Sequence, residues 1–162
     1  MTRLGTWYSA AVAVLLVVIL SGCTAFVNDQ NKEANDLGLR IVSQLKAQPS
    51  VADANYTFKS SLDVSPRMAV SVLVKPEQAT HDRAQRLVDL AMDAYWHSSA
   101  DVQTFSVSVY SVAHPPVAGQ DNQKREIAGG EVHLNADQQN KSTDQRRLEE
   151  KFGPRPTPTP TK

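Results

Sequence analysis

Residues 67–112 decide the fold, and they read RMAVSVLVKPEQATHDRAQRLVDLAMDAYWHSSADVQTFSVSVYSV. Apolar and polar residues alternate over 67–75 and again over 102–112, which is the period of a β-strand with one buried face. Between these segments Pro76 ends the first strand, and Thr80 is a suitable helix N-cap. A strand, a helix and a second parallel strand in this order normally form a right-handed crossover. The helix carries an apolar stripe at spacings of three and four residues, made of Ala84, Leu87, Val88, Ala91, Ala94 and Tyr95.

Two more elements precede this unit. An apolar stripe with helical spacing predicts a first helix, which Pro49 ends. Residues 51–59 follow as a strand whose apolar face includes Tyr56 and Phe58, and residues 60–66 are expected to form a loop. The order α-β-β-α-β predicts an α+β fold, a small two-layer sandwich with both helices on one face of a mixed sheet. The stripe of the first helix consists of Ala34, Leu37, Gly38, Ile41, Val42 and Leu45.

The centre of the predicted core lies where the strand at 67–75 meets the helix that follows it. Val72 is in the middle of the apolar face of the strand, and Leu87 is in the middle of the stripe of the helix. Because a crossover lays the helix back across its own sheet, we expect both side chains among the most buried. Asp89 falls on the polar face of the same helix and is expected to face solvent.

The element order resembles two known folds. It is similar to a ferredoxin-like plait lacking or permuting one strand, and residues 127–134 are a weak late strand that is a candidate for the vacant place. Gly129-Gly130 interrupts this strand and suggests a turn or a bulge. The order also resembles the BON domain, a small envelope module of bacteria. The glycine that follows the second strand in that family is absent, because Lys75-Pro76 stands there. Neither resemblance implies a binding site.

The chain after Leu134 is polar, and it ends in the Pro/Thr-rich sequence PRPTPTPTK at 154–162. Leu148 and Phe152 offer one apolar helical turn. Segments with so little apolar surface cannot offset the entropy of ordering. Residues 135–162 are therefore predicted to form a disordered tail that folding does not require.

The N-terminal residues predict export. An unbroken apolar run at 10–20 follows Arg3. It is shorter than the roughly 20 residues of a spanning helix and suits the h-region of a signal peptide. The run leads into LSGC at residues 20–23, which resembles the bacterial lipobox. The resemblance implies cleavage between Gly22 and Cys23 and a diacylglyceryl group on Cys23. An uncleaved anchor helix is the alternative, and it would hold the domain on the same side of the membrane.

A lipid anchor defines both the location and the division of the chain. Two acyl chains hold a protein durably, whereas one of myristoyl length binds with an association constant of only about 10⁴ M⁻¹. The domain is therefore expected on the extracytoplasmic face of the cell membrane. The predicted parts are a signal peptide at 1–22, a lipidated cysteine and tether at 23–32, an α+β domain at 33–134 and the tail at 135–162.

Composition argues against several function classes. The chain has 17 Lys and Arg and 17 Asp and Glu, so its net charge is zero. Loss of Arg3 with the signal peptide leaves 16 minus 17, or −1. Nucleic-acid binding usually needs a clearly basic surface, so no nucleic-acid partner is expected. Cys23 is the only cysteine, which leaves the exported domain without a disulfide.

No compact catalytic or metal-binding motif is present in the sequence. The four histidines, His81, His97, His114 and His133, are separated by 16, 17 and 19 residues, which matches no metal-ligand spacing. A Gly-x-Ser-x-Gly nucleophile elbow is also missing. We therefore expect no metal, no cofactor and no catalytic residue.

Two functions follow from these observations. The first is a non-catalytic binding or scaffold module that is held at the membrane and contacts another component of the cell envelope. Trp96 and His97, at the end of the second helix, are a candidate contact patch for such a partner. The alternative is an envelope enzyme, or a subunit of one, whose site gathers scattered residues such as His81 or His97 with carboxylates. A two-lobed solute-binding lipoprotein is disfavoured by the small size of the domain.

Overall fold

The strand–helix–strand pattern builds an α+β fold. The computed structural model describes residues 32–61, 63–134 and 141–156, so the predicted signal peptide with Gly22, and the predicted lipidation site Cys23, lie outside the described residues. The elements are an N-terminal helix over residues 32–46, β1 (Val51–Ser61), β2 (Val64–Val74), α2 (His81–Trp96), β3 (Thr104–Ser111), β4 (Glu126–His133) and α3 (Thr143–Phe152), with short 3₁₀ turns at Pro76–Gln78 and Gln123–Arg125.

The strands form one mixed sheet in the order β1-β2-β3-β4. The pairs β1–β2 and β3–β4 are antiparallel, and β2 pairs in parallel with β3 through the α2 crossover. The late strand predicted at 127–134 is present as β4, at the outer edge beside β3. The parallel strands of a split βαβ unit have another strand between them, whereas β2 and β3 are direct neighbours here. The sheet therefore has no vacant central place.

The predicted loop at 60–66 is mostly strand. Ser61 pairs with Val64, so β1 and β2 are joined by a tight hairpin. Pro66 lies inside β2, where it cannot donate a ladder hydrogen bond, but its carbonyl accepts one from the amide of Gln103. The ladder between β1 and β2 is irregular next to this point, between Lys59 and Ser61. A strand proline is tolerated at such an irregularity, and for this reason turn chemistry misplaced the boundary.

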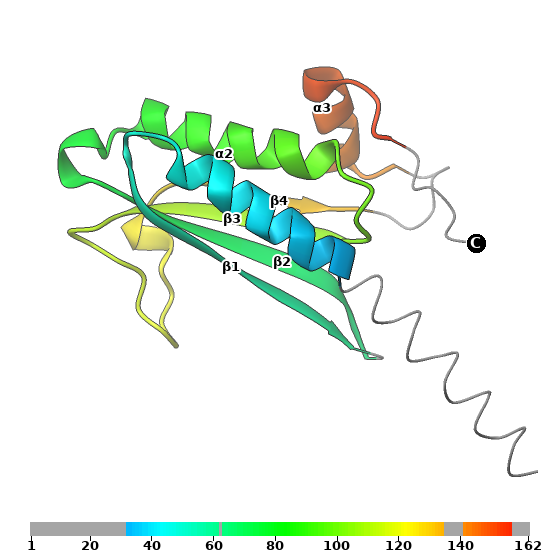
Figure 1. The fold of residues 1–162 in the computed structure, drawn as a ribbon, viewed down its shortest axis with the longest axis horizontal. Coiled ribbons are helices and arrows are strands. Elements are labelled where there is room, and N and C mark those ends of the chain that lie inside the picture. Colours follow the sequence, from blue (N-terminus) through cyan, green and yellow to red (C-terminus); the bar gives the residue numbers. More distant parts are fainter. Residues whose placement is uncertain (1–31, 62, 135–140, 157–162) are drawn as a thin grey trace, which may run out of the picture. The chain divides into compact units, whose positions relative to one another are not determined.

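The helices cover one face of the sheet (Figure 1). The N-terminal helix and α2 bury the stripes that the sequence predicted, against the alternate residues of the strands. Val72 is 0% exposed and Leu87 is 4% exposed, so the predicted centre of the core is confirmed. The opposite face carries short polar side chains, including Ser71, Ser106 and Ser108. This difference between the two faces explains the period-two alternation of the strands.

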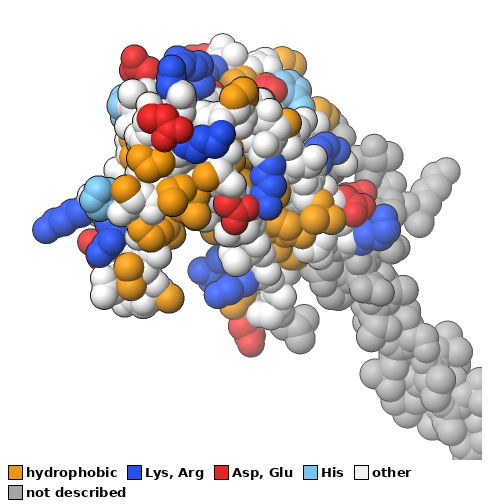
Figure 2. Space-filling model, turned by 60° about the vertical axis from the view of Figure 1, so that its left-hand side comes forward, with side chains coloured by type: hydrophobic (Ala, Val, Ile, Leu, Met, Phe, Trp, Pro, Cys, Tyr) orange, Lys and Arg blue, Asp and Glu red, His pale blue; other side chains and the backbone are white. Residues whose placement is uncertain are grey.

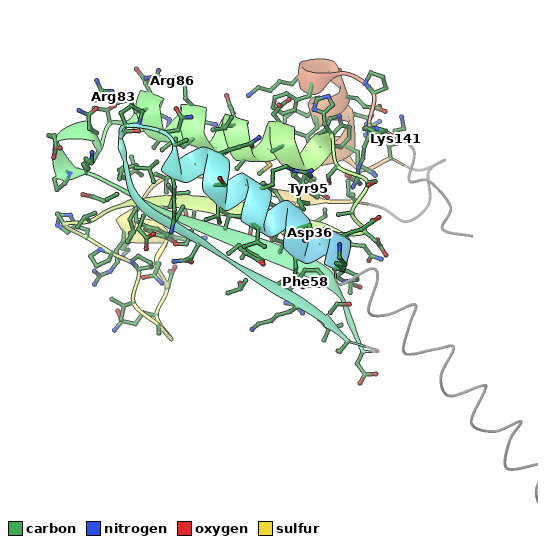
Figure 3. All side chains as sticks on the ribbon, viewed as in Figure 1. Asp36, Phe58, Arg83, Arg86, Tyr95 and Lys141 are labelled. Carbon is green, nitrogen blue, oxygen red and sulfur yellow. The ribbon has the colours of Figure 1, made fainter. Side chains whose placement is uncertain are left out.

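Tyr95 joins α2 to the sheet. Its ring stacks on Phe105 of β3 with centroids 4.4 Å apart, and its hydroxyl donates to the carbonyl oxygen of Val102 at 2.8 Å. Figure 3 shows the side chain between α2 and the strands. Burial raises the pKa of the Tyr95 hydroxyl far above its ordinary value, which keeps it neutral and able to donate.

The prediction of a disordered tail from 135 to 162 is wrong for residues 141–156. Helix α3 begins with a capping box in which Ser142 and Gln145 satisfy each other's backbone amides. Leu148 is buried in the core, and Lys151 forms an ion pair of 2.7 Å with Asp89. One buried apolar side chain, a good cap and an ion pair are enough to dock this short helix. Residues 135–140 and 157–162 lie outside the described residues.

Candidate functional site

Among the described residues, a hollow lies where the parallel strands β2 and β3 end. Ligands of open α/β sheets bind outside the carboxyl ends of the strands, because loops can diverge there. The chain leaves β3 after Ser111 and returns as β4 at Glu126, and the loop between them projects from this end of the sheet (yellow in Figure 1). The hollow has a volume of about 900 Å³, within the range of small-molecule sites.

Four segments line this hollow, and they contribute different chemistry. The connection from β2 to α2 supplies short apolar side chains and the end of β3 supplies a serine, whereas the loop and the start of β4 supply the charged side chains. The lining consists of Pro76, Ala79, Ser111, Ala113, His114, Gln120, Asp121, Lys124, Arg125, Glu126 and Ile127.

The loop between β3 and β4 is ordered by its own hydrogen bonds. The Asn122 side chain accepts from the amide of Val117 at 2.8 Å and donates to the carbonyl oxygen of the same residue at 3.0 Å. Asp121 accepts from the amide of Gln123 at 3.0 Å, and Arg125 donates to the carbonyl oxygen of Pro115 at 3.5 Å. These bonds close the loop on itself, so the wall of the hollow is formed before any ligand arrives.

A bulge sets the position of Glu126 at the edge of the hollow. The β3–β4 register shifts between Val109 and Tyr110, so that Tyr110 lies opposite Glu126. Bulges re-aim side chains in this way, often beside functional sites. The Glu126 carboxylate lies over Gly129, where an added Cβ would meet it. The sequence placed a turn or bulge at Gly129-Gly130; the bulge is instead at the start of β4, and Gly129 leaves room for the carboxylate.

The charges in the hollow are mixed, and two of them have no partner. Arg125 and Asp121 bond within the loop, as described above. Among the described residues, no hydrogen bond or ion pair engages the side chain of Lys124 or that of Glu126, and none joins the two. Figure 2, in which this end of the molecule comes forward, shows cationic, anionic and hydrophobic side chains interspersed. The hollow thus presents an available cation and an available anion.

The structure separates the histidines. His114 lines the hollow, and Nδ1 of His81 lies 3.0 Å from the carbonyl oxygen of Ile127, which also lines it. His97 pairs with Asp93 on its own helix at 3.2 Å, and His133 lies 3.5 Å from Glu131 on β4. No group of three metal-ligating side chains occurs in the described part of the chain. The sequence singled out His81 and His97 for an enzymatic site; His97 does lie beside a carboxylate, that of Asp93, but His114 is the histidine that lines the hollow together with Asp121 and Glu126.

A smaller hollow of about 400 Å³ lies between the end of the N-terminal helix and α2, and it is lined by Arg83 and Arg86. Figure 3 shows both arginines extending from α2 away from the sheet. Arg83 donates to the side chain of Gln78. No pair of oppositely charged side chains without partners lines this smaller hollow among the residues that the structure describes, so the larger hollow is the better candidate for a binding site.

The predicted contact patch at Trp96 and His97 is wrong for Trp96. Its side chain is only 2% exposed, and its indole Nε1 donates to the carbonyl oxygen of Gly153 at 2.7 Å. The guanidinium of Arg155 lies over the rings of Tyr95 and Trp96, at 5.3 Å and 5.9 Å from their centroids. The C-terminal segment of the chain therefore occupies the place that the sequence assigned to a partner. His97 is exposed at the end of α2.

Sequence reasoning missed the larger hollow. Its lining comes from segments between Pro76 and Ile127 that only the folded sheet brings together, and no spacing motif connects them. The one available signal was the long polar connection after the third strand, which is typical of functional loops.

Among the residues that the structure describes, no helix has the length and apolar character needed to cross a membrane. In comparisons with known proteins, no family model and no curated protein matches this chain.

Proposed function

We propose that this chain is a bacterial lipoprotein, anchored by lipid on Cys23 at the extracytoplasmic face of the cell membrane, and that its α+β domain binds a polar envelope component without transforming it. The observation that carries the anchor is LSGC at residues 20–23, directly after an apolar run of h-region length. Neutral overall charge fits a partner other than nucleic acid.

The binding role is supported by the larger hollow. Its charged side chains are exposed or half-exposed, and they line a preformed wall. Such groups suit reversible recognition, since preorganisation lowers the entropy that a ligand must lose on binding. A general base, by contrast, needs a partner that orients it and fixes its tautomer.

An envelope enzyme is the second candidate, and one observation favours it. His114 shares the hollow with Asp121 and Glu126, which is the combination of a histidine with carboxylates that acid–base chemistry uses. However, no hydrogen bond orients the His114 ring among the described residues, and its side chain is exposed. The geometry therefore supports binding better than catalysis.

Metabolic labelling with palmitate tests the anchor. The unchanged protein should incorporate label and remain with the membrane fraction, whereas Cys23→Ser should lose both, because the thiol is the acceptor of the lipid. Thr24→Ser, next to the lipobox, is the matched control and should retain both. Equal labelling and equal membrane retention of Cys23→Ser would contradict the proposal.

A further inference from the structure

We propose that the hollow at the ends of β2 and β3 binds a short peptide with both termini free and with small apolar side chains. The inference rests on the proposed binding function and names the class of ligand. It assigns Lys124 to the peptide carboxylate and Glu126 to the peptide ammonium.

The charges provide the first argument. Lys124 and Glu126 both line the hollow, and neither has a partner among the described residues. A ligand that is only anionic would meet the Glu126 carboxylate, and a ligand that is only cationic would meet the Lys124 ammonium. A ligand that carries one charge of each sign at separate ends is complementary to both groups.

The remaining lining provides the second argument. Pro76, Ala79, Ala113 and Ile127 supply apolar surface without a large aromatic ring. Such surface favours methyl-sized side chains over sugars or flat heterocycles, which pack on aromatic rings. A volume of about 900 Å³ exceeds what one amino acid needs and leaves room for a peptide of a few residues.

The way the site is built provides the third argument. The bulge in β4 and the space at Gly129 set the position of the Glu126 carboxylate, and the Asn122 bonds close residues 117–122, directly before the turn that carries Lys124. Backbone groups of the loop hold the side chains of Arg125 and Asp121, which leaves Lys124 and Glu126 as the oppositely charged side chains without a hydrogen-bond partner in the described part of the chain. An ordered frame around two unpartnered charges is the arrangement expected of a binding site.

Calorimetric titration of the full-length protein in detergent, at low ionic strength, tests the assignment with trialanine as the probe. Its N-acetylated and C-amidated forms each lack one terminal charge. Lys124→Gln should weaken binding of trialanine by up to about fivefold, the effect expected of one exposed charge pair. The same substitution should leave binding of the amidated peptide unchanged. Glu126→Gln should show the reciprocal pattern with the acetylated peptide.

Matched controls remove the same charges at the opposite end of the sheet. Lys59→Gln and Asp63→Asn are exposed substitutions, and they should leave binding of every peptide unchanged. Circular dichroism checks that each variant is folded. The proposal is overturned if trialanine fails to bind the folded protein. It is also overturned if Lys124→Gln weakens binding of the amidated peptide as much as binding of trialanine.

Free alanine in the same titration separates two sources of the ligand. Binding of trialanine with no binding of alanine supports a peptide, and equal binding of alanine contradicts the peptide length that the volume implies. Failure of these titrations leaves the lipid anchor untouched, because palmitate labelling tests Cys23 independently.

Discussion

At the scale of single residues, Gly38 gives the clearest link from sequence to packing. It lies in the buried stripe of the N-terminal helix, where a Cβ would come within 2.4 Å of the Tyr56 ring on β1. The Tyr56 hydroxyl also donates to the Asn35 side chain at 3.2 Å. The helix can therefore approach the sheet only because Gly38 has no side chain. The stripe predicted that this position is buried, but the need for glycine depends on a ring 18 residues away in the chain.

Gly38→Ala should destabilise the protein although alanine is the better helix former by about 1 kcal/mol. Overpacking against a packed ring typically costs about 1–3 kcal/mol, so after subtracting the gain in helix propensity we expect a net loss of up to roughly 2 kcal/mol. Urea unfolding measures this loss. Ser43→Ala, on the exposed side of the same helix, is the control and should be neutral or slightly stabilising. The double variant Gly38→Ala/Tyr56→Ala should lose less stability than the sum of the two single variants, because removal of the ring also removes the clash. A loss equal to that sum would contradict the clash.

Leu87 and Leu39 form a matched pair of leucines. Leu87 is 4% exposed, on the buried face of α2, whereas Leu39 is 59% exposed on the N-terminal helix. Leu87→Ala should cost about 2–5 kcal/mol, the range for a core leucine. Leu39→Ala should remain within about 0.5 kcal/mol of the unchanged protein. Chemical denaturation of both variants measures the difference, and similar costs would mean that the α2 face is misassigned.

At the scale of elements, the long segments with a regular apolar period could be predicted from the sequence, whereas the short helix α3 could not. β2, α2 and β3 each show an uninterrupted period, so their type and order follow from the pattern alone. Helix α3 has one buried apolar residue, Leu148, and a sequence in which most other positions are polar. Its cap at Ser142 and Gln145 was a readable signal, but docking depends on Trp96, which is distant in sequence. Pattern without tertiary context could not distinguish this helix from a tail.

Removal of residues 135–162 should lower the thermal midpoint. The truncation exposes the site of Leu148 and leaves the Trp96 indole without its carbonyl partner, which should cost at least about 2 kcal/mol. For a domain of this size, each kcal/mol corresponds to a fall of about 3–5 °C. In a Trp7→Phe background, the emission of Trp96 should also shift to longer wavelength as the ring meets water.

Two point substitutions refine this experiment. Leu148→Ala should reproduce part of the fall in the thermal midpoint, and Glu150→Ala, on the exposed side of α3, should leave the midpoint almost unchanged. An unchanged midpoint and unchanged emission in the truncated chain would show that α3 does not stabilise the domain.

At the scale of the whole domain, the chain enters at one end and the larger hollow lies at the other. Lys46 pairs with Asp53, and Gly38 packs on Tyr56, so the N-terminal helix runs antiparallel to β1. Its first residues therefore lie near the hairpin that joins β1 to β2, as Figure 1 shows, and the loop between β3 and β4 lies at the opposite end. The sequence predicted the tether and the order of elements. It could not place the hollow relative to the tether, because that relation exists only once the crossover has formed.

This geometry predicts how the anchored protein presents its hollow. The anchor proposed at Cys23 would be joined to the domain by residues 24–31, a length of chain that can span at most about 30 Å. The hairpin end is therefore held nearer to the membrane than the loop end. Two single-cysteine variants test this, Asp63→Cys at the hairpin and Ala118→Cys in the loop, both at exposed positions. In the proposed lipoprotein the thiol of Cys23 carries the lipid, so only the introduced cysteine is expected to react with a polymer-linked maleimide. In vesicles, Ala118→Cys should react at its detergent rate, while Asp63→Cys should react more slowly. The opposite order would mean that the hollow faces the membrane, and would redirect the search for its ligand to the lipid surface.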